Sequence, residues 1–267
     1  MTEHAAAGFA KPVLALDTST AALCVAVVAD GRVLADGRSI VERSHSVLAV
    51  PMVKDVLAAA GVPHDRLGGI AVGCGPGSYT GVRIAVTIAK TLAWAWGVPL
   101  AGVSSLEALA LGAAEGAARE WIVPLMDARR GQVYTAGFAS GGDGGWRRLA
   151  EDGVRLMKDW ADELAERVAS AAVGEGAAGP AVPERPDRIR FVGDPSLHLE
   201  NIERLKARLD GRVQVETRPT DMEGRAIAEL GIRRLAAGEA DDPHALVPNY
   251  TQLAEAEAKL LAGRQEG

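Results

Sequence analysis

The sequence predicts an α/β protein built from two lobes of the same type. Three observations support this: short apolar runs alternate with segments of helical periodicity, aliphatic residues are abundant while aromatic residues make up only 4%, and one order of elements occurs twice. A chain of 267 residues can bury the cores of two compact lobes. The first lobe is expected to contain strands at 12–18, 22–29, 31–38, 68–74 and 99–103, and helices at 46–60 and 79–96.

The second lobe is expected to repeat that order. Its predicted elements are strands at 120–127, 131–139, 146–153, 189–193 and 212–216, and helices at 155–169 and 196–209. The order β-β-β-α-β-α-β is that of a ribonuclease-H-like, or actin-like, half domain, in which helices cover both faces of a sheet with parallel strands. The two halves share no visible sequence repeat, so the predicted duplication rests on the order of elements alone.

Changes in this pattern suggest where the domains begin and end. They divide the chain into a first lobe, a second lobe and a C-terminal helix with its tail, at residues 1–103, 104–215 and 216–267. Inside the second lobe, the stretch 171–188 is rich in Ala, Gly and Pro and is expected to be a mobile surface insertion. The C-terminal helix is predicted at about 220–237, and residues 251–263 have further helical potential.

Charge and composition exclude several kinds of partner. The formal net charge is −6, and residues 1–103 carry 8 Lys and Arg against 7 Asp and Glu, the largest basic excess of the three segments. Binding of a phosphate backbone requires clustered cations, so the chain alone is not expected to hold RNA.

Cys24 and Cys74 lie in apolar runs and are expected to be buried thiols. No signal pattern or membrane-length apolar run is evident, which predicts a cytoplasmic protein.

A glycine-rich turn precedes the helix at 79–96. Such a turn could cradle a phosphate, because glycines allow close approach and a helix N-terminus presents free N–H groups. The glycine spacing misses the dinucleotide-binding rule by one residue, no Gly-Lys-Ser/Thr follows, and Pro76 removes one donor. A structural turn that sets the helix against the sheet is therefore favoured. Contact with a nucleotide or a partner is the alternative for Gly75, Gly77 and Ser78.

Two further turns have candidate polar residues. Asp17, Thr18 and Ser19 close the first strand, where actin-like enzymes use an acid and small hydroxyls to handle metal-bound phosphate. The glycine expected after the acid is missing, so a turn held by local hydrogen bonds is favoured over a residual nucleotide contact. Asp127 and Arg129 open the corresponding turn of the second lobe. They could orient a phosphate or a partner carboxylate, or form an ordinary hairpin turn.

The helices at 46–60 and 79–96 are apolar around most of their circumference. The first has Lys54 and Asp55 as its only charged residues, and the second has only Arg83 and Lys90. A helix of this kind must be buried on more than one face, so one face meets the sheet and the other needs a second surface. That surface is either the rest of the chain or a partner. Two helices contributed by each protein would then form a four-helix contact.

Several ordered segments together resemble one known family. They are LALDTST at 14–20, RSHS at 43–46, AVGCGPGSYTGVRI at 71–84, GVSSLEAL at 102–109, DARRGQVY at 127–134, PNY at 248–250 and EAE at 255–257. The residues of these segments and their order along the chain are similar to those of the bacterial TsaB group. The match is dense over about residues 12–136 and thinner beyond.

The resemblance implies a non-catalytic scaffold or activator. Members of this family assist TsaD, which transfers a threonylcarbamoyl group to the adenosine beside the anticodon of transfer RNA. The implied partners are TsaD directly and the ATPase TsaE at the shared junction, with transfer RNA reached only through the complex and a homodimer formed by the chain alone. No cofactor of its own is implied, although ADP or ATP at the partner interface is left open. The residues expected to contact a partner are His45, Leu48, Met52, Val53, Val56, Leu57, Tyr79, Thr80, Arg83 and Ile84.

Two enzyme classes remain as alternatives. The fold is compatible with an ATP-dependent small-molecule kinase, but the double-glycine adenosine clasp of that class is not evident. A metallopeptidase would need clustered ligands, yet the histidines never occur at i, i+3 or i, i+4 spacing. The metal-binding helix of TsaD corresponds to Ser104–Ser105–Leu106–Glu107–Ala108–Leu109–Ala110 here, which contains no histidine. The sequence therefore predicts no metal site and no catalytic residue.

Overall fold

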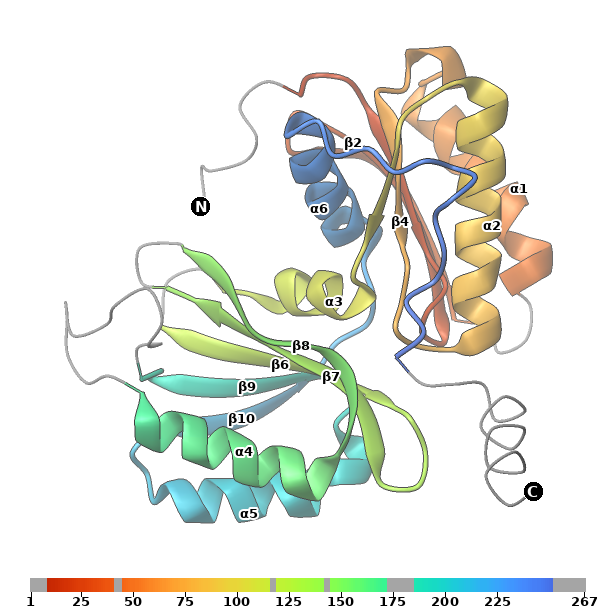
Figure 1. Ribbon diagram of the computed structural model, residues 1–267. Helices are drawn as coiled ribbons and strands as arrows, with labels where there is room; N and C mark the ends of the chain where they lie inside the picture. Colours follow the sequence, from red (N-terminus) through yellow and green to blue (C-terminus); the bar gives the residue numbers. More distant parts are fainter. Residues whose placement is uncertain (1–8, 41–44, 116–118, 142–144, 172–184, 252–267) are drawn as a thin grey trace.

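The computed structural model describes residues 9–40, 45–115, 119–141, 145–171 and 185–251, which form two five-stranded sheets flanked by helices (Figure 1). The strands of the first sheet are β1 (Val13–Asp17), β2 (Ala22–Ala29), β3 (Arg32–Ile40), β4 (Gly69–Gly73) and β5 (Leu100–Val103). The strands of the second sheet are β6 (Glu120–Asp127), β7 (Gln132–Ser140), β8 (Trp146–Leu156), β9 (Arg188–Gly193) and β10 (Gln214–Pro219).

The two sheets have the same topology. The first has the order β3-β2-β1-β4-β5 and the second the order β8-β7-β6-β9-β10. In each, the first three strands along the chain pair antiparallel and the last two extend the sheet in parallel. Strand for strand, the second lobe therefore repeats the first. This confirms the predicted α/β fold of two ribonuclease-H-like, actin-like lobes.

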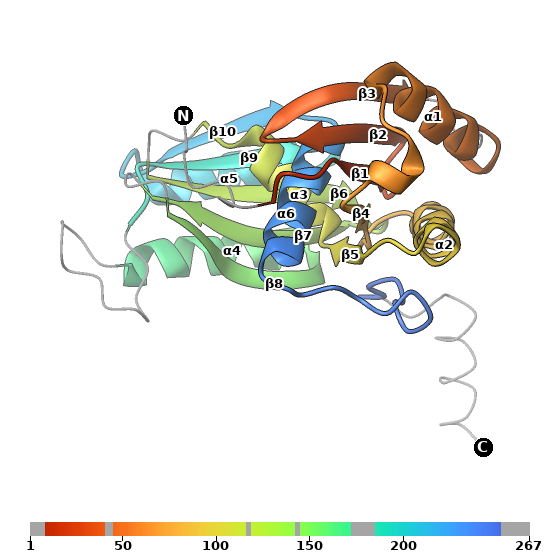
Figure 2. The same ribbon diagram turned by 90° about the horizontal axis from the view of Figure 1, so that it is seen from above.

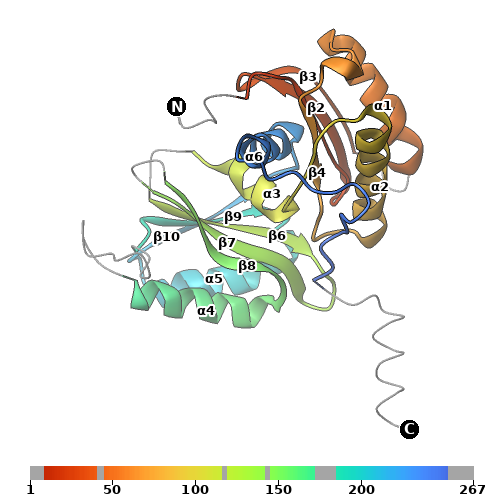
Figure 3. The ribbon, with the colours of Figure 1, turned by 45° about the horizontal axis from the view of Figure 1, so that its top comes forward.

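Six helices complete the described fold: α1 (His45–Ala60), α2 (Tyr79–Trp96), α3 (Ser105–Ala113), α4 (Met157–Ser170), α5 (Leu199–Leu209) and α6 (Gly224–Ala236). Short 3-10 turns lie at His64–Arg66 and Ser196–His198. α1 and α2 cover the outer face of the first sheet, α4 and α5 cover the outer face of the second, and α3 and α6 lie between the sheets (Figure 3). The order of layers is thus helices, sheet, helices, sheet, helices.

The two inner helices are exchanged between the lobes. α3 follows β5 in the chain but packs on β6, β7 and β9 of the second sheet, while α6 follows β10 but packs on β1, β2, β4 and β5 of the first. The helix expected at 220–237 therefore packs against the first sheet, and the boundary expected after residue 215 falls inside β10. α3 was not among the helices predicted from the sequence pattern, although the resemblance to TsaD aligned part of it with a helix.

Two predicted segments lie mostly outside the described residues. Residues 172–184 of the predicted insertion at 171–188 are not described, nor are residues 252–263 of the segment with helical potential. Across the described part of the chain, no helix is both long enough and apolar enough to span a bilayer.

Candidate functional site

The turn after β1 is built around the carboxylate of Asp17, which is fully buried. Its Oδ1 accepts hydrogen bonds from the backbone N–H and the hydroxyl of Ser19, both at 2.7 Å. Its Oδ2 accepts a 2.6 Å bond from the hydroxyl of Ser105, at the start of α3, and that hydroxyl in turn accepts a 3.0 Å bond from the N–H of Gly75. Both carboxylate oxygens are therefore engaged inside the protein, where they connect β1, α3 and the glycine-rich loop.

Burial and hydrogen bonding act on Asp17 in opposite directions. Burial raises the pKa of the Asp17 carboxyl, while the bonds from Ser105 and Ser19 lower it in part. A carboxylate that binds phosphate through a metal has to face an open space. This one faces its own protein, so the geometry favours the structural turn over the phosphate contact for Asp17 and Ser19.

The turn after β1 and the glycine-rich loop interlock. The Thr18 hydroxyl donates a 2.6 Å bond to the carbonyl of Gly81, and the N–H of Ser78 donates a 2.7 Å bond to the carbonyl of Ser19. A Cβ at Gly81 would overlap the Thr18 carbonyl, and one at Gly77 would overlap the Ser19 carbonyl. The glycines are needed because another loop, rather than a ligand, approaches them closely.

The loop also starts α2. The hydroxyl of Ser78 accepts a bond from the Gly81 N–H, which makes Ser78 the N-cap of the helix. Gly75 is fixed by its bond to Ser105, and Gly77 is packed against Ser19. The N–H groups of Gly75 and Ser78, two donors that a phosphate cradle could use, are therefore occupied.

The corresponding turn of the second lobe differs, because it is exposed. The Asp127 side chain accepts a 2.9 Å bond from the backbone N–H of Arg129. Arg129, Arg130 and Gly131 follow one another with φ of 66°, 54° and 73°, a left-handed run that is uncommon for residues with a Cβ. Asp127 and Arg129 form a locally bonded hairpin turn with exposed side chains.

Aromatic side chains fill the space where the glycine-rich loop meets the second lobe. Tyr134 of β7 lines a small cavity together with Tyr79, Tyr250 and Gly77, and its volume is about 20 Å³. This space holds about one water molecule. In this conformation, the cavity cannot accept a nucleotide.

The outer face of α1 and α2 is the second candidate site. Ala49, Val53 and Val56 of α1 and Val82, Ala85, Val86, Ala89 and Ala93 of α2 face the first sheet and are buried. Away from the sheet, apolar side chains remain open to solvent: Val47 is 71% exposed and Val50 is 53% exposed. Neither α3 nor α6 covers this face, because both lie on the opposite side of the sheet (Figure 1).

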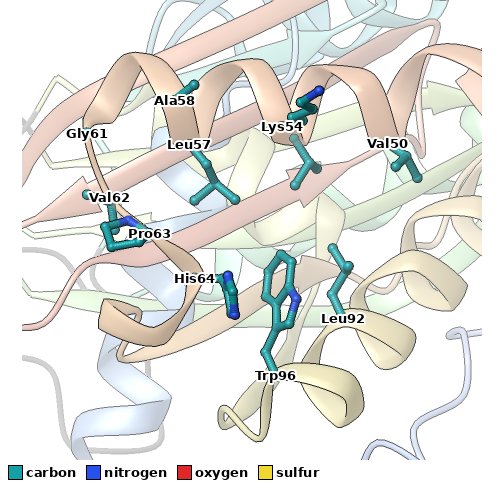
Figure 4. Close-up of a pocket in the computed structure, with 11 residues that line it drawn as sticks. Val50, Lys54, Leu57, Ala58, Gly61, Val62, Pro63, His64, Leu92 and Trp96 are labelled. Atoms are coloured by element: carbon teal, nitrogen blue, oxygen red, sulfur yellow. The ribbon is translucent and has the colours of Figure 1, made fainter.

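Between the two helices runs an apolar groove of about 520 Å³. Val50 and Leu57 of α1 and Leu92 and Trp96 of α2 approach it from opposite sides (Figure 4). At one end, the ring of His64 lies 5.3 Å from that of Trp96. The groove is the kind of concave apolar surface that accepts side chains of another protein.

The structure divides the predicted contact residues into two groups. Tyr79, Thr80 and Arg83 are exposed, whereas His45, Leu48, Met52, Leu57 and Ile84 are half-buried. Val53 and Val56 are 3% and 4% exposed and pack in the core under α1, and Val53 also lines the groove, so their contact with a partner stays a prediction. A helix that is apolar all round does not show in its sequence which stripe meets the sheet.

Several residues of this region were not predicted from the sequence. Val50, Leu92 and Trp96 line the groove, and Tyr250 accepts a 2.7 Å bond from Arg83 Nε. Leu92 and Trp96 are four positions apart on α2, and this spacing could have indicated that they share one apolar face. Nothing local in the sequence links Tyr250 to Arg83, since 167 positions separate them.

The described residues contain no group of three or more His, Cys, Asp or Glu side chains placed to hold a metal ion. Cys24 and Cys74 are both buried free thiols. Burial raises the pKa of the Cys74 thiol to about 12. A thiol with so high a pKa is neutral at physiological pH and a poor nucleophile.

Sequence comparison relates the chain to proteins of transfer RNA modification. The profile of the family described as "TsaD: tRNA N6-adenosine threonylcarbamoyltransferase" matches residues 39–259. The Bacillus subtilis (strain 168) protein named tRNA threonylcarbamoyladenosine biosynthesis protein TsaB is 37% identical over 258 residues, 95% of this chain and 99% of its own length. The protein of the same name from Escherichia coli K12 is 40% identical over 136 residues, 50% of this chain and 58% of its own.

Solved structures agree with that relationship. A Pseudomonas aeruginosa structure, described as an uncharacterized protein with similarity to peptidase YEAZ, matches with a TM-score of 0.67 and 28% identity over 91% of this chain and all of its own. YeaZ from the same organism matches with a TM-score of 0.67 and 26% identity, over 90% of this chain and 99% of its own. Together with the interlocked loops and the shared motifs, these matches show that the chain belongs to the TsaB family of tRNA threonylcarbamoyladenosine biosynthesis proteins.

Proposed function

We propose that this chain is a non-catalytic subunit in the synthesis of threonylcarbamoyladenosine on transfer RNA. Its task is to bind TsaD through the outer face of α1 and α2 and to hold that enzyme in an active arrangement. TsaE joins the assembly near their junction, and transfer RNA is bound by the complex rather than by this chain. Family membership supports the pathway, and the geometry of the chain supports the role within it.

One observation carries the docking proposal. The groove between α1 and α2 is apolar and is bordered by the exposed Val50, and the helices α3 and α6 lie on the opposite side of the sheet. Burial of apolar surface contributes about 25 cal/mol per Å², so covering several hundred Å² offsets much of the free-energy cost of association. In the absence of TsaD, the same face is expected to pair two copies of the chain.

The non-catalytic role is supported by the state of the candidate phosphate loops. Asp17 has both oxygens bonded within the protein, and Ser78 caps α2 instead of facing a ligand. These contacts disfavour the kinase alternative, because its phosphate loop would need these groups to face a ligand. We propose no cofactor for the chain itself, and an ADP or ATP contact at the partner interface remains a prediction.

Reconstitution of the reaction tests the proposal. TsaD and TsaE from the same organism, transfer RNA and threonylcarbamoyl-adenylate are incubated with and without this chain, and modified adenosine is measured after nuclease digestion. The expected result is modification only when the chain is present, with no product from the chain alone. Equal modification in its absence would refute the activator role, and product from the chain without TsaD would show that it is an enzyme.

A further inference from the structure

The segment that follows α6 crosses the first lobe as a strap, residues 239–251, which we call the C-terminal strap (Figure 2). The Asp241 N–H donates a 2.7 Å bond to the carbonyl of Leu100 in the edge strand β5. The Asp241 carboxylate accepts bonds from the Gly102 N–H at 2.7 Å and from Arg234 of α6 at 2.8 Å. The strap is thus anchored firmly where it begins.

α2 holds the rest of the strap with its only two charged side chains. Lys90 Nζ donates a 2.7 Å bond to the carbonyl of Leu246, and Arg83 Nε donates a 2.7 Å bond to the hydroxyl of Tyr250. Seven residues separate Arg83 from Lys90, about two helical turns, so both project from the same side of the helix. In an otherwise apolar helix, both charges serve this intramolecular contact.

Around Arg83 the contact becomes a cluster, which we call the latch: Tyr79, Arg83 and Tyr250. The guanidinium carbon lies 4.0 Å from the centre of the Tyr79 ring and 5.5 Å from that of Tyr250. The two rings are themselves 5.5 Å apart. Stacking and the charge-assisted hydrogen bond together fix the end of the strap to the first turns of α2.

The same end of the strap touches both lobes. The Asn249 N–H donates a 2.7 Å bond to the Cys74 carbonyl in the first lobe, and its side-chain amide donates a 3.3 Å bond to the Asp152 carboxylate of β8 in the second. Tyr134 of β7 lines the 20 Å³ cavity beside Tyr250. Residues 248–251 therefore close the gap between the lobes beside the glycine-rich loop.

From this placement we propose that the latch couples the docking face to the closure of the two lobes. Arg83 is exposed on α2, the helix that borders the proposed docking groove with Leu92 and Trp96. A partner that covers α2 competes with Tyr250 for the Arg83 guanidinium. When Arg83 leaves Tyr250, residues 248–251 are released and the small cavity lined by Tyr134 opens. The partner half of this inference rests on the proposed docking function, while the latch itself is a property of the free chain.

Amide exchange of the free protein, followed by NMR at Asn249, tests the latch. Tyr250→Phe keeps the ring and removes the hydroxyl that accepts the bond, and Arg83→Met removes the donor. We expect exchange at Asn249 to become about tenfold faster in each variant, the factor for one lost hydrogen bond to a charged group. Val247→Ala is the control, because Val247 lies in the same strap and is 67% exposed. Unchanged exchange in both latch variants, or an equal rise in the control, would overturn the latch.

Addition of TsaD from the same organism tests the coupling. Exchange at Asn249 is expected to rise in the complex toward the rate of Tyr250→Phe, while Asp241 stays protected. Stronger protection of Asn249 in the complex would overturn the coupling and leave the docking proposal intact. Failure of TsaD to bind the unmodified chain would overturn docking and coupling together, and the free-protein exchange would still decide whether the latch exists.

Discussion

The outer helices of the two lobes occupy equivalent positions in the fold but have opposite surfaces. α1 and α2 together contain 4 charged residues among 34, whereas α4 and α5 contain 11 among 25. The α4–α5 pair is crossed by ion pairs, with Asp162 meeting Arg204 and Arg208 at 3.2 and 2.9 Å. The α1–α2 pair instead has an apolar groove. Because the topology is the same, the fold does not require the apolar surface of the first lobe, and the proposed interface would account for it.

Charged residues on the apolar face of α1 should have the largest effect on the affinity for TsaD. The double substitution Val47→Asp and Val50→Asp is expected to weaken association with TsaD at least about 100-fold, because two carboxylates would lose water without gaining partners. Both residues are more than half exposed, so the fold should persist. Calorimetric titration measures the affinity, and thermal unfolding checks the fold.

The second lobe supplies the matched control for that variant. Leu197 and Leu199 are 69% and 50% exposed, close to the 71% and 53% of Val47 and Val50. Leu197→Asp with Leu199→Asp should leave the affinity within about threefold. An equal loss in both double variants would remove the distinction between the lobes. Met52→Asp would test binding less specifically. Met52 packs close to Gly37 of β3, so this substitution would also affect the fold.

Removing one anchor from the groove should have a smaller effect. Trp96→Ala is expected to weaken binding about tenfold, or about 1.4 kcal/mol, since aromatic side chains in concave apolar sites carry much of the binding energy. The matched change is Trp94→Ala, because Trp94 lies on the same helix, is 66% exposed and does not line the groove. Surface plasmon resonance compares the two, and an equal or larger loss for Trp94→Ala would locate the contact elsewhere on α2.

The interior of the first lobe gives a pH-dependent prediction. Burial raises the pKa of the Asp17 carboxyl above its unfolded value of 3.8, so the folded state binds more protons than the unfolded state in that range. The contribution of Asp17 to stability therefore falls as the pH rises from 3.8 through the folded pKa. Asp17→Asn lacks this ionisation and should gain stability relative to the original chain as the pH rises from 4 to 7, as measured by urea unfolding. A difference that stays constant with pH would contradict this assignment.

The salt concentration should affect the apolar groove and the charged α4–α5 surface differently. The groove has few charges, so raising NaCl from about 0.05 to 0.5 M should change the affinity for TsaD less than about threefold. The same change should weaken the α4–α5 ion pairs, each worth at most about 1 kcal/mol at the surface. A steep fall in affinity with salt would indicate a charged interface instead.

The smallest effect is expected in the charged lobe itself. Arg204→Ala removes the bonds to Asp162 and to the Lys158 carbonyl and should cost about 1 kcal/mol of unfolding free energy or less, because these groups are exposed. Association with TsaD should not change. Urea unfolding and titration calorimetry measure the two quantities separately, and a clear loss of affinity would assign a partner to the second lobe.

The fold could be predicted from the sequence, because the order of strands and helices follows from local patterns of apolar residues. Strand-like apolar runs and helix-period segments gave both lobes, and their equivalence appeared in the sheet order. α3 was missed because it is short and apolar on nearly all sides, although Ser104 and Glu107 form the S-x-x-E pattern of a helix start and the Ser104 hydroxyl caps it. The exchange of α3 and α6 between sheets depends on tertiary packing and has no local signal.

The candidate sites were only partly predictable, for the same reason. The motif at 71–84 identified the loop, but it did not show that Thr18 and Ser19 of another turn bond to Gly81 and Ser78. The apolar character of α1 indicated a second buried face, yet not that Val53 and Val56 face the sheet while Val50 faces outward. The bond from Arg83 to Tyr250 joins residues too distant in the chain for any pattern to connect.

In the proposed complex, the first lobe contacts TsaD and its topological equivalent does not. Hydrogen–deuterium exchange of the chain with and without TsaD, read by mass spectrometry over peptides of all four outer helices, tests it most directly. We expect slower exchange in α1 and α2, at His45–Ala60 and Tyr79–Trp96, with no change in α4 and α5. Protection confined to α4 and α5 would contradict it.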